Sequence, residues 1–411
     1  MTIEIRAMRQ DEIERWLESL ALGFLDRVDS AKLAEEVKPL WDFARVWGAL
    51  DGDLIVGTFR SWASEITVPG GSRLPASAVA AVTVRPTHRR RGILSAMVAA
   101  EHLAARERGE AIAMLYCSEY PIYGRFGYGP ACAEATWTLD ATATGFHTPA
   151  TGTMEVPNLS AAVRDEMTAI FDAWRLFQPG EIRRRDFSWD FDLGLRESAW
   201  SPKWKGFVAL HRDGSGRADG YARYRAEEKW TKGQPRGILR VDELHALNDD
   251  AYAALWQFLA QVDLVATVKA ERRRLNERLP WLLTNARAAA PSDGGDGLWV
   301  ALLDVPRALA ARTYEHEGTI VLEAIEHAGT DAETRTRVAL VASPAGATCT
   351  ATDRSPDLTL DIAALGAAYL GGSRLRDAVV ARGVDEHRAG ALQQADLLFA
   401  TLEQPWCSTD F

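Results

Sequence analysis

Cysteine is scarce in this 411-residue sequence: there are four, and none of them forms a Cys-x-x-Cys pair. Such wide spacing argues against a disulfide framework and favours reduced, buried thiols. The eight histidines form neither an HExxH nor an HxxxH pattern, so we expect no metal site. Positive charge is not in excess either, because the net charge is −10. A chain with that charge is not expected to bind nucleic acid through its overall field.

Long apolar runs are absent as well. No uninterrupted run in the sequence is long enough to span a bilayer, so we expect no membrane partner. The opening segment MTIEIRAMRQDEIERW is charged throughout, which argues against a signal peptide, and we therefore expect a cytoplasmic protein. The 47% hydrophobic and 25% charged residues are typical of a globular chain. Its length suits two or three domains.

Two stretches rich in Gly, Pro, Ser or Thr divide the chain, at 141–158 and 286–297. We interpret both as linkers and predict domains at 1–145, 146–290 and 291–411. The first two domains show the same order of helix, hairpin and strand patterns, so the second is interpreted as a structural duplicate of the first. The strand and helix candidates of the last domain predict an α+β domain with a mostly antiparallel sheet.

The centre of the first domain is predicted to be a strand–loop–helix–strand unit. Residues 78–84 read AVAAVTV, a continuous apolar run typical of a central strand covered on both faces. Apolar residues then recur at helical spacing from Ile93 until Gly109. The segment IAMLYCS at 112–118 is a second buried strand. Between the first strand and the helix lies PTHRRRGIL, at 86–94.

Arginine triplets occur three times, at 89–91, 183–185 and 272–274. Only the first lies between a buried strand and a helix that begins at a glycine, and we assign the other two to the surface. The N–H groups and dipole at a helix start bind anions. Gly92 allows a close approach to the backbone, and the arginines add bidentate donors. Because Walker and GxGxxG patterns are missing, the loop predicts a pyrophosphate site for another kind of nucleotide-like cofactor.

The loop and a downstream segment together resemble one superfamily. VTVRPTHRRRG, at 82–92, is similar to the acetyl-CoA loop of GCN5-related N-acetyltransferases, whose pattern is Arg/Gln-x-x-Gly-x-Gly/Ala. Leu94 departs from that pattern at its last small-residue position. YGRFGY, at 123–128, resembles the Tyr-x-x-x-Gly-Phe segment of the same proteins. With Leu94 included, PTHRRRGIL and SEYPIYGRFGYGPA make the whole chain resemble the enhanced intracellular survival (Eis) family of aminoglycoside N-acetyltransferases.

This resemblance implies an α/β (α+β) fold class with two tandem acetyltransferase folds, the second degenerate, followed by a sterol-carrier-protein-like α+β domain. It also implies a homo-hexamer arranged as a trimer of dimers. Acetyl-CoA is the implied co-substrate, with no metal. The residues expected at the acetyl-CoA site are Val82, Thr83, Val84, Arg89, Arg90, Arg91, Gly92, Ile93, Leu94, Ser95, Ser118 and Glu119.

For catalysis, the resemblance implies direct transfer with Tyr123 as general acid to the CoA sulfur. The general base is then the terminal carboxylate, carried by Phe411. From the residues alone, Tyr123 suits a packed core position equally, and a chain end is commonly frayed. Phe24, Asp26 and Asp410 are expected to bind the amine substrate. Three tryptophans fit either the core or the pocket wall: Trp41, Trp47 and Trp62.

The predicted function is therefore acetyl-CoA-dependent N-acetyl transfer to polycationic amines. The resemblance points to aminoglycosides acetylated at several positions, and so to antibiotic resistance. Acidic side chains in an acidic protein suit a cationic small molecule. Two alternatives stay open: a protein-lysine or polyamine acetyltransferase with the same machinery, and a hydrophobic-ligand carrier that uses the third domain.

Overall fold

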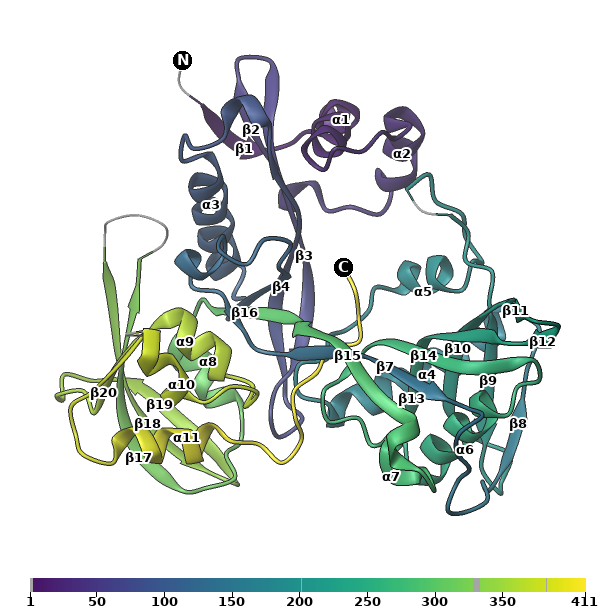
Figure 1. The fold of residues 1–411 in the computed structure, drawn as a ribbon. Coiled ribbons are helices and arrows are strands. Elements are labelled where there is room, and N and C mark those ends of the chain that lie inside the picture. The colour runs from purple at the N-terminus through teal and green to yellow at the C-terminus, as the bar shows by residue number, and fades with distance from the viewer. Residues whose placement is uncertain (1–2, 201, 328–332, 382) are drawn as a thin grey trace.

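The structure is a computed structural model that describes residues 3–200, 202–327, 333–381 and 383–411. It contains three units, each built on its own sheet and called here the first, second and third unit (Figure 1). The first sheet has seven strands in the order β1-β2-β3-β4-β5-β16-β6. Its strands are β1 (Glu4–Ala7), β2 (Val46–Asp51), β3 (Leu54–Thr67), β4 (Arg73–Val84), β5 (Ile112–Tyr116), β6 (Gly129–Pro130) and β16 (Leu298–Leu302).

Three helices belong to the first unit: α1 (Ile13–Gly23), α2 (Ser30–Val37) and α3 (Ile93–Glu107). Helix α3 buries Met97 and Val98 against Val56 and Phe59 of the sheet. The apolar residues of the sheet's other face continue into the core of the third unit. The sheet is thus buried on both faces, which explains the continuous apolar run in β4.

The second sheet also has seven strands, in the order β15-β7-β14-β13-β10-β9-β8. These are β7 (Ala133–Asp140), β8 (Thr153–Glu155), β9 (Phe207–Arg212), β10 (Ala218–Glu227), β13 (Gly237–Ala246), β14 (Val265–Arg274) and β15 (Ala289–Asp296). A separate hairpin joins β11 (Trp230–Thr231) to β12 (Gln234–Pro235). The helices of this unit are α4 (Ala161–Trp174), α5 (Asp186–Asp192), α6 (Asp249–Ala260) and α7 (Leu279–Leu282).

The predicted linker at 286–297 is wrong over most of its length. Residues 289–296 form β15, which pairs antiparallel with β7 along the outer edge of the second sheet. An edge strand tolerates Pro291 and the glycines at its far end, because one row of its backbone groups needs no strand partner. Composition alone therefore cannot separate such a strand from a linker.

The third unit has a five-stranded sheet in the order β19-β18-β17-β20-β21. In this sheet the pairing of β17 with β20 is parallel and the other three pairings are antiparallel, so the sheet is mostly antiparallel, as predicted. The strands are β17 (Gly318–Glu326), β18 (Thr334–Ser343), β19 (Gly346–Ala351), β20 (Leu358–Asp361) and β21 (Val384–Glu386). The helices are α8 (Val305–Ala311), α9 (Ile362–Ala368), α10 (Leu375–Ala378) and α11 (Ala391–Phe399).

Two strands belong to a different sheet from the one that their place in the sequence would suggest. β16 lies between β5 and β6 of the first sheet, with Leu298 opposite Tyr116 and Leu302 opposite Ile112. β7, which precedes the predicted second domain in sequence, lies inside the second sheet. The predicted domain ranges 1–145, 146–290 and 291–411 stay a prediction. Each of these two strands lies in one predicted range but pairs with strands of another.

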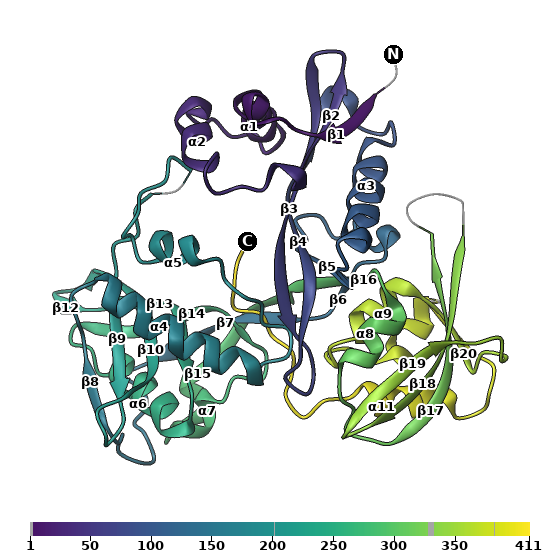
Figure 2. The same cartoon turned by 180° about the vertical axis from the view of Figure 1, so that it is seen from behind.

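The end of the chain leaves α11 and returns to the middle of the molecule. In both views it lies between α5 and the strands β3 and β4 (Figures 1 and 2). Among the described residues, no helix combines the length and the apolar character that a membrane crossing needs.

Candidate active site

A gap between β4 and β5 opens the first sheet. The two strands pair in parallel only where Ala76–Val79 faces Ile112–Leu115. Further along, β4 keeps its partner β3 on the other side as far as Val84. Residues 80–84 therefore present a free sheet edge to the gap, and such an edge accepts an extended chain by strand addition. The predicted acetyl-CoA contacts Val82 and Val84 lie on this edge.

The arginine loop lies at the open end of the gap. Gly92 precedes α3 with a φ of 75°, and Arg90 has a φ of 63°, so both are left-handed. Arg89, Arg90 and Arg91 are exposed, and within the described chain none of the three has an acidic partner. The first N–H groups of α3 have no intrahelical acceptor. This set of donors fits the diphosphate of acetyl-CoA.

The other predicted acetyl-CoA residues have varied surroundings. The Thr83 hydroxyl is buried and lies 2.9 Å from the Thr58 hydroxyl. Ile93 is in the core, whereas Leu94 and Ser95 are half-buried at the start of α3. Two exposed residues, Ser118 and Glu119, lie just beyond the end of β5. Their contact with acetyl-CoA stays a prediction.

Tyr123 lies in the same apolar cluster as the β4 edge. Its side chain is 9% exposed, and Val82, Val84 and Leu94 pack against the cluster that contains it. Burial raises the pKa of the Tyr123 phenol, and the nearby Cys117 thiol raises it further. The phenol is therefore neutral and holds its proton at physiological pH, as a proton donor must. This position is compatible with both the catalytic and the packing interpretation of Tyr123.

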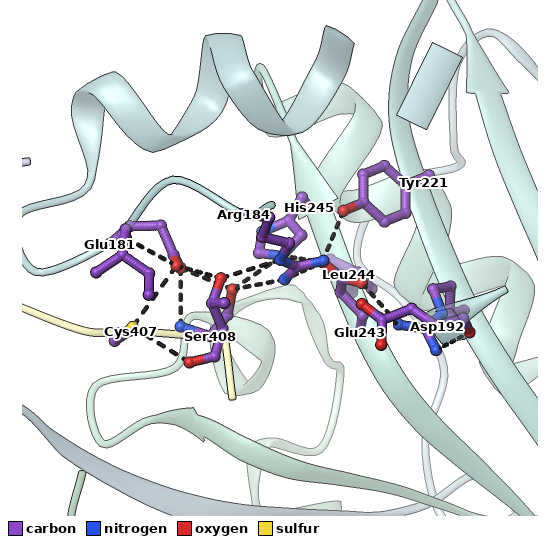
Figure 3. A network of polar contacts seen from close by, with 12 residues as sticks. Glu181, Arg184, Asp192, Tyr221, Glu243, Leu244, His245, Cys407 and Ser408 are labelled. Carbon is purple, nitrogen blue, oxygen red and sulfur yellow. Dashed lines mark hydrogen bonds and ion pairs between the residues drawn. The ribbon is translucent and has the colours of Figure 1, made fainter. Parts of the chain in front are cut away.

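The chain end is anchored by the second unit, not frayed. Glu181 is fully buried, and its carboxylate accepts hydrogen bonds from the Ser408 amide at 2.8 Å and the Thr409 hydroxyl at 2.7 Å. The indole N–H of Trp406 donates to the carbonyl of Arg272 at 2.9 Å. Figure 3 shows Glu181 with Cys407 and Ser408 at one end of this polar network. These bonds fix the direction in which the last residues run.

Arg184 extends the same network into the second sheet. It donates to the Thr409 hydroxyl at 3.0 Å and forms an ion pair of 2.6 Å with Glu243. The Tyr221 hydroxyl donates to the same carboxylate at 2.7 Å. Figure 3 shows Arg184 between the chain end and Glu243.

The surface assignment of the second and third arginine triplets is therefore wrong except at Arg183, which is exposed. Arg184 is 7% exposed and Arg273 is 4% exposed. The segment before α5 runs beside β3, where the Thr67 amide donates to the Glu181 carbonyl at 2.8 Å, and this contact draws the second triplet between the units. The third triplet ends β14 and faces the chain end. A sequence pattern does not reveal burial that arises between units.

Phe411 reaches the first sheet beside the gap. Its ring makes edge-to-face contacts with Trp62 on β3, at 5.0 Å between centroids, and with Tyr116 at the end of β5, at 5.1 Å. The Tyr116 hydroxyl also donates to the Thr409 carbonyl at 3.0 Å. The last residue is thereby brought to the end of β5, where the two central strands diverge.

Two cavities meet at Phe411. One, called here the polar chamber, has a volume of about 360 Å³ and lies between the second sheet and the chain end. The other, called the apolar chamber, has a volume of about 450 Å³ and lies between α1, α2 and α5. Four residues line both: Arg185, Phe187, Phe191 and Phe411. A molecule in either chamber can therefore contact the last residue of the chain.

The predicted substrate residues are not all in these chambers. Phe24 lines the apolar chamber. Asp410 lines the polar chamber, where Arg272 pairs with it at 2.6 Å. Asp26 lines neither of the two, and its carboxylate accepts the Arg27 amide at 2.7 Å.

The three tryptophans that could have been either core or pocket-wall residues fall into both groups. Trp62 lines the polar chamber and Trp41 lines the apolar one. Trp47 is half-buried against the core, and its indole donates to the buried Glu101 at 2.7 Å. Across the described residues, no three His, Cys, Asp or Glu side chains are grouped so that they could hold a metal ion.

Comparisons with known proteins match the whole chain. Models of an acetyltransferase (GNAT) domain match residues 4–131 and 180–300, and a sterol carrier protein domain model matches 305–408. An uncharacterized N-acetyltransferase of Streptomyces griseus is 38% identical over 100% of both chains. The N-acetyltransferase Eis of Mycobacterium tuberculosis is 35% identical over 86% of this chain and 85% of its own.

Solved structures agree with these matches. Eis1 from Mycobacterium abscessus has a TM-score of 0.84 at 33% identity, covering 99% of this chain and 100% of its own. A GCN5-related N-acetyltransferase from Anabaena variabilis has a TM-score of 0.84 at 20% identity, with 100% of both chains covered, which shows the fold alone. The predicted fold class, with two acetyltransferase folds and a sterol-carrier-like domain, is confirmed.

Proposed function

The chain belongs to the Eis family of GCN5-related N-acetyltransferases, and from that premise we propose that it transfers the acetyl group of acetyl-CoA directly to an amine held at Phe411. The single observation that carries the proposal is the seating of Phe411. Its ring packs on Trp62 and Tyr116 of the acetyltransferase sheet. A chain end that merely covered a surface would need no such seat beside the gap between β4 and β5.

The acetyl-CoA site in this proposal is the gap and the arginine loop. The free edge of β4 pairs with the pantetheine arm through the backbone of Val82 and Val84. The N–H groups from Gly92 to Ser95 and the three exposed arginines hold the diphosphate. The left-handed φ of Gly92, 75°, suits glycine and turns the chain into α3.

The reaction needs two proton movements. The nitrogen lone pair of the amine attacks the thioester carbonyl carbon, so that a C–N bond forms and the C–S bond breaks. The Phe411 carboxylate takes a proton from the amine, directly or through water. Tyr123, whose pKa is raised by burial, donates its proton to the departing sulfur, which leaves as the CoA thiol. Solvent then returns Tyr123 and Phe411 to their starting protonation states.

Extension of the chain end tests the proposal. A Gly-Ser dipeptide added after Phe411 moves the carboxylate away from the ring seat. We expect kcat to fall by at least about a hundredfold, as for loss of a general base, with unchanged affinity for acetyl-CoA. The matched control is Phe411→Tyr, which keeps both a terminal carboxylate and an aromatic ring for the seat and should retain most of the turnover. Full turnover by the extended chain would remove the terminal carboxylate from the mechanism.

The finer expectations from the sequence are tested separately from the transfer chemistry. The sequence leads us to expect an aminoglycoside substrate that is acetylated at several positions, with antibiotic resistance as the consequence. Measuring CoA release with kanamycin, with spermidine and with a lysine peptide tests this expectation. CoA release with none of these amines, despite acetyl-CoA binding, would favour the hydrophobic-ligand carrier. The protein is expected to be cytoplasmic and to form a homo-hexamer, a trimer of dimers. Light scattering tests the assembly.

A further inference from the structure

The charged side chains that line the apolar chamber beside Phe411 are mainly positive. Glu36 is its one acidic side chain among the described residues, and that carboxylate already accepts the Ala199 amide at 2.9 Å and the Ser198 hydroxyl at 3.2 Å. Four basic side chains face it: Arg60, Arg185, Arg196 and Lys203. A polycation placed in this chamber would meet like charge, which costs free energy.

Arg60 is the most unusual of these side chains. It lies on β3, is 9% exposed, and its buried Nε has no hydrogen-bond partner. Its guanidinium lies over the rings of Trp41, at 4.1 Å, and Trp62, at 4.9 Å. Within the described chain no carboxylate pairs with it. Burial lowers the pKa of Arg60, and the nearby Arg185 lowers it further. A buried cation with ring contacts alone is poorly compensated.

Arg185 brings a second cation to the same indole. Its guanidinium lies 4.3 Å from the Trp62 ring and 4.6 Å from the Phe187 ring. Burial lowers its pKa to about 10, only partly offset by the Asp192 carboxylate. No ion pair of Arg185 is found in the part of the chain that the structure describes. Two guanidiniums on one tryptophan repel each other, and an anion bound between them would relieve both the repulsion and the missing pairing.

The polar chamber provides an internal comparison. There Arg184 pairs with Glu243 at 2.6 Å, Arg223 with the same carboxylate at 3.2 Å, and Arg272 with Asp410 at 2.6 Å. Each of these three arginines therefore has a carboxylate partner. Arg60, which lines the apolar chamber, and Arg185, which lines both chambers, have no such partner in the described chain.

We propose that the acetyl acceptor is an amine that also carries an oxyanion, a carboxylate or a phosphate, on an apolar body, and that Arg60 and Arg185 bind this oxyanion. The inference rests on the proposed function, because it places the amine of the same molecule at Phe411. The apolar wall, which includes Phe24 and Trp41, covers the body of the acceptor. The two guanidiniums offer the forked donors that carboxylate and phosphate groups take.

Matched amines test the proposal on the intact enzyme. Tyrosine is compared with tyramine for a carboxylate, pyridoxamine phosphate with pyridoxamine for a phosphate, and kanamycin serves as the polycation. We expect the member that carries the oxyanion in at least one pair to have a kcat/KM about tenfold or more above that of its partner without the oxyanion, and above that of kanamycin. The pair that shows the preference identifies the oxyanion. Equal turnover within both pairs, or a preference for kanamycin, would overturn the inference and leave the acetyltransferase function standing.

Two arginine variants locate the effect. In Arg60→Met and in Arg185→Met, the preference for the amine that carries the oxyanion should fall to about one, chiefly through a higher KM for that amine. Arg60→Lys should retain part of it. Arg217→Met, which removes an exposed arginine from the β9–β10 turn, should keep the preference. An equal loss of kcat with every amine in Arg60→Met would assign the arginine pair to the Phe411 carboxylate and contradict the proposal.

A binding measurement separates this inference from the proposed function. The acids 3-(4-hydroxyphenyl)propionate and phenyl phosphate have the oxyanion and the ring but no amine. Calorimetric titration should show that one of them binds the wild-type enzyme and binds Arg60→Met and Arg185→Met at least tenfold more weakly, with all three proteins folded by circular dichroism. Equal binding to the wild type and both variants, or no binding to the wild type, contradicts the oxyanion site. If an acid binds but no amine releases CoA, the acetyltransferase proposal fails on its own.

Discussion

Arg272 Nη1 lies 2.6 Å from Asp410 Oδ2, so a strand of the second unit holds the residue next to the chain end. The same guanidinium lies 4.6 Å from the ring of Tyr116 in the first sheet. The backbone carbonyl of Arg272 accepts a hydrogen bond from the indole N–H of Trp406. One residue on β14 therefore links the sheets of the first two units to the last segment of the chain.

Arg272→Gln should lower kcat about tenfold without changing the affinity for acetyl-CoA, because the chain end loses its ion pair while the Trp406 hydrogen bond to the backbone remains. Steady-state kinetics measure the effect. Asp410→Asn should cost less than Arg272→Gln, since Arg272 also contacts Tyr116. The double variant should be no worse than Arg272→Gln alone, as expected for two residues that act together. Strict additivity of the two losses would show that the ion pair does not position the chain end.

Gly92→Ala should raise the KM for acetyl-CoA about tenfold. A Cβ at Gly92 meets no atom within 4 Å, so the strain comes from its φ of +75° alone. Gly216 is a matched control, with a φ of +84° and equally open surroundings. Both substitutions should lower the free energy of unfolding by about 1 kcal/mol. A KM effect of the same size in Gly216→Ala would detach the loop from acetyl-CoA binding.

Tyr123→Phe should lower kcat about a hundredfold, at the chemical step, with little change in the KM for acetyl-CoA. Because burial raises the pKa of the phenol, its acid form persists to higher pH than that of an exposed tyrosine. The wild-type rate should therefore show no loss from this group between pH 7 and about 10. A near-normal rate in Tyr123→Phe, or an alkaline decline near pH 8 that the variant abolishes, speaks against the donor role.

His102 makes the folded protein sensitive to acid. It is 4% exposed, and its Nε2 lies 3.0 Å from the Tyr128 hydroxyl. Burial, with a further contribution from Arg106, lowers the pKa of His102 from 6.5 to about 3. Below pH 6.5 His102 is protonated in the unfolded chain but stays neutral in the folded protein, so the free energy of unfolding decreases as the pH falls. Denaturant titration should show His102→Gln losing about 2 kcal/mol less than the wild type between pH 7 and pH 5. Equal losses would refute this.

Local patterns predicted the centre of the first unit well. The apolar run at 78–84 lies within β4, and the helix predicted from Ile93 is α3. Both depend on residues that are close in sequence, where periodicity and helix-start signals act directly. The mostly antiparallel sheet of the third unit followed from the same kind of pattern.

The surroundings of the chain end could not be predicted in this way. Glu181, Arg184 and Arg272 meet Trp406–Thr409 across distances of well over a hundred residues. Their burial depends on how three units pack, which neither charge pattern nor periodicity encodes. For the same reason the chamber arginines Arg60 and Arg185 carried no sequence signal. One was an isolated arginine in an apolar strand, and the other was part of a triplet typical of a surface.

The position of β16 has a consequence for how the protein is made. The first sheet receives this strand, Leu298–Leu302, between β5 and β6, so roughly three-quarters of the chain must leave the ribosome before the N-terminal unit can complete its own sheet. Synthesis and folding therefore run in different orders. An N-terminal fragment that stops before β16 exposes one side of β5, and under the proposed mechanism acetyl transfer also requires Phe411 to have been added.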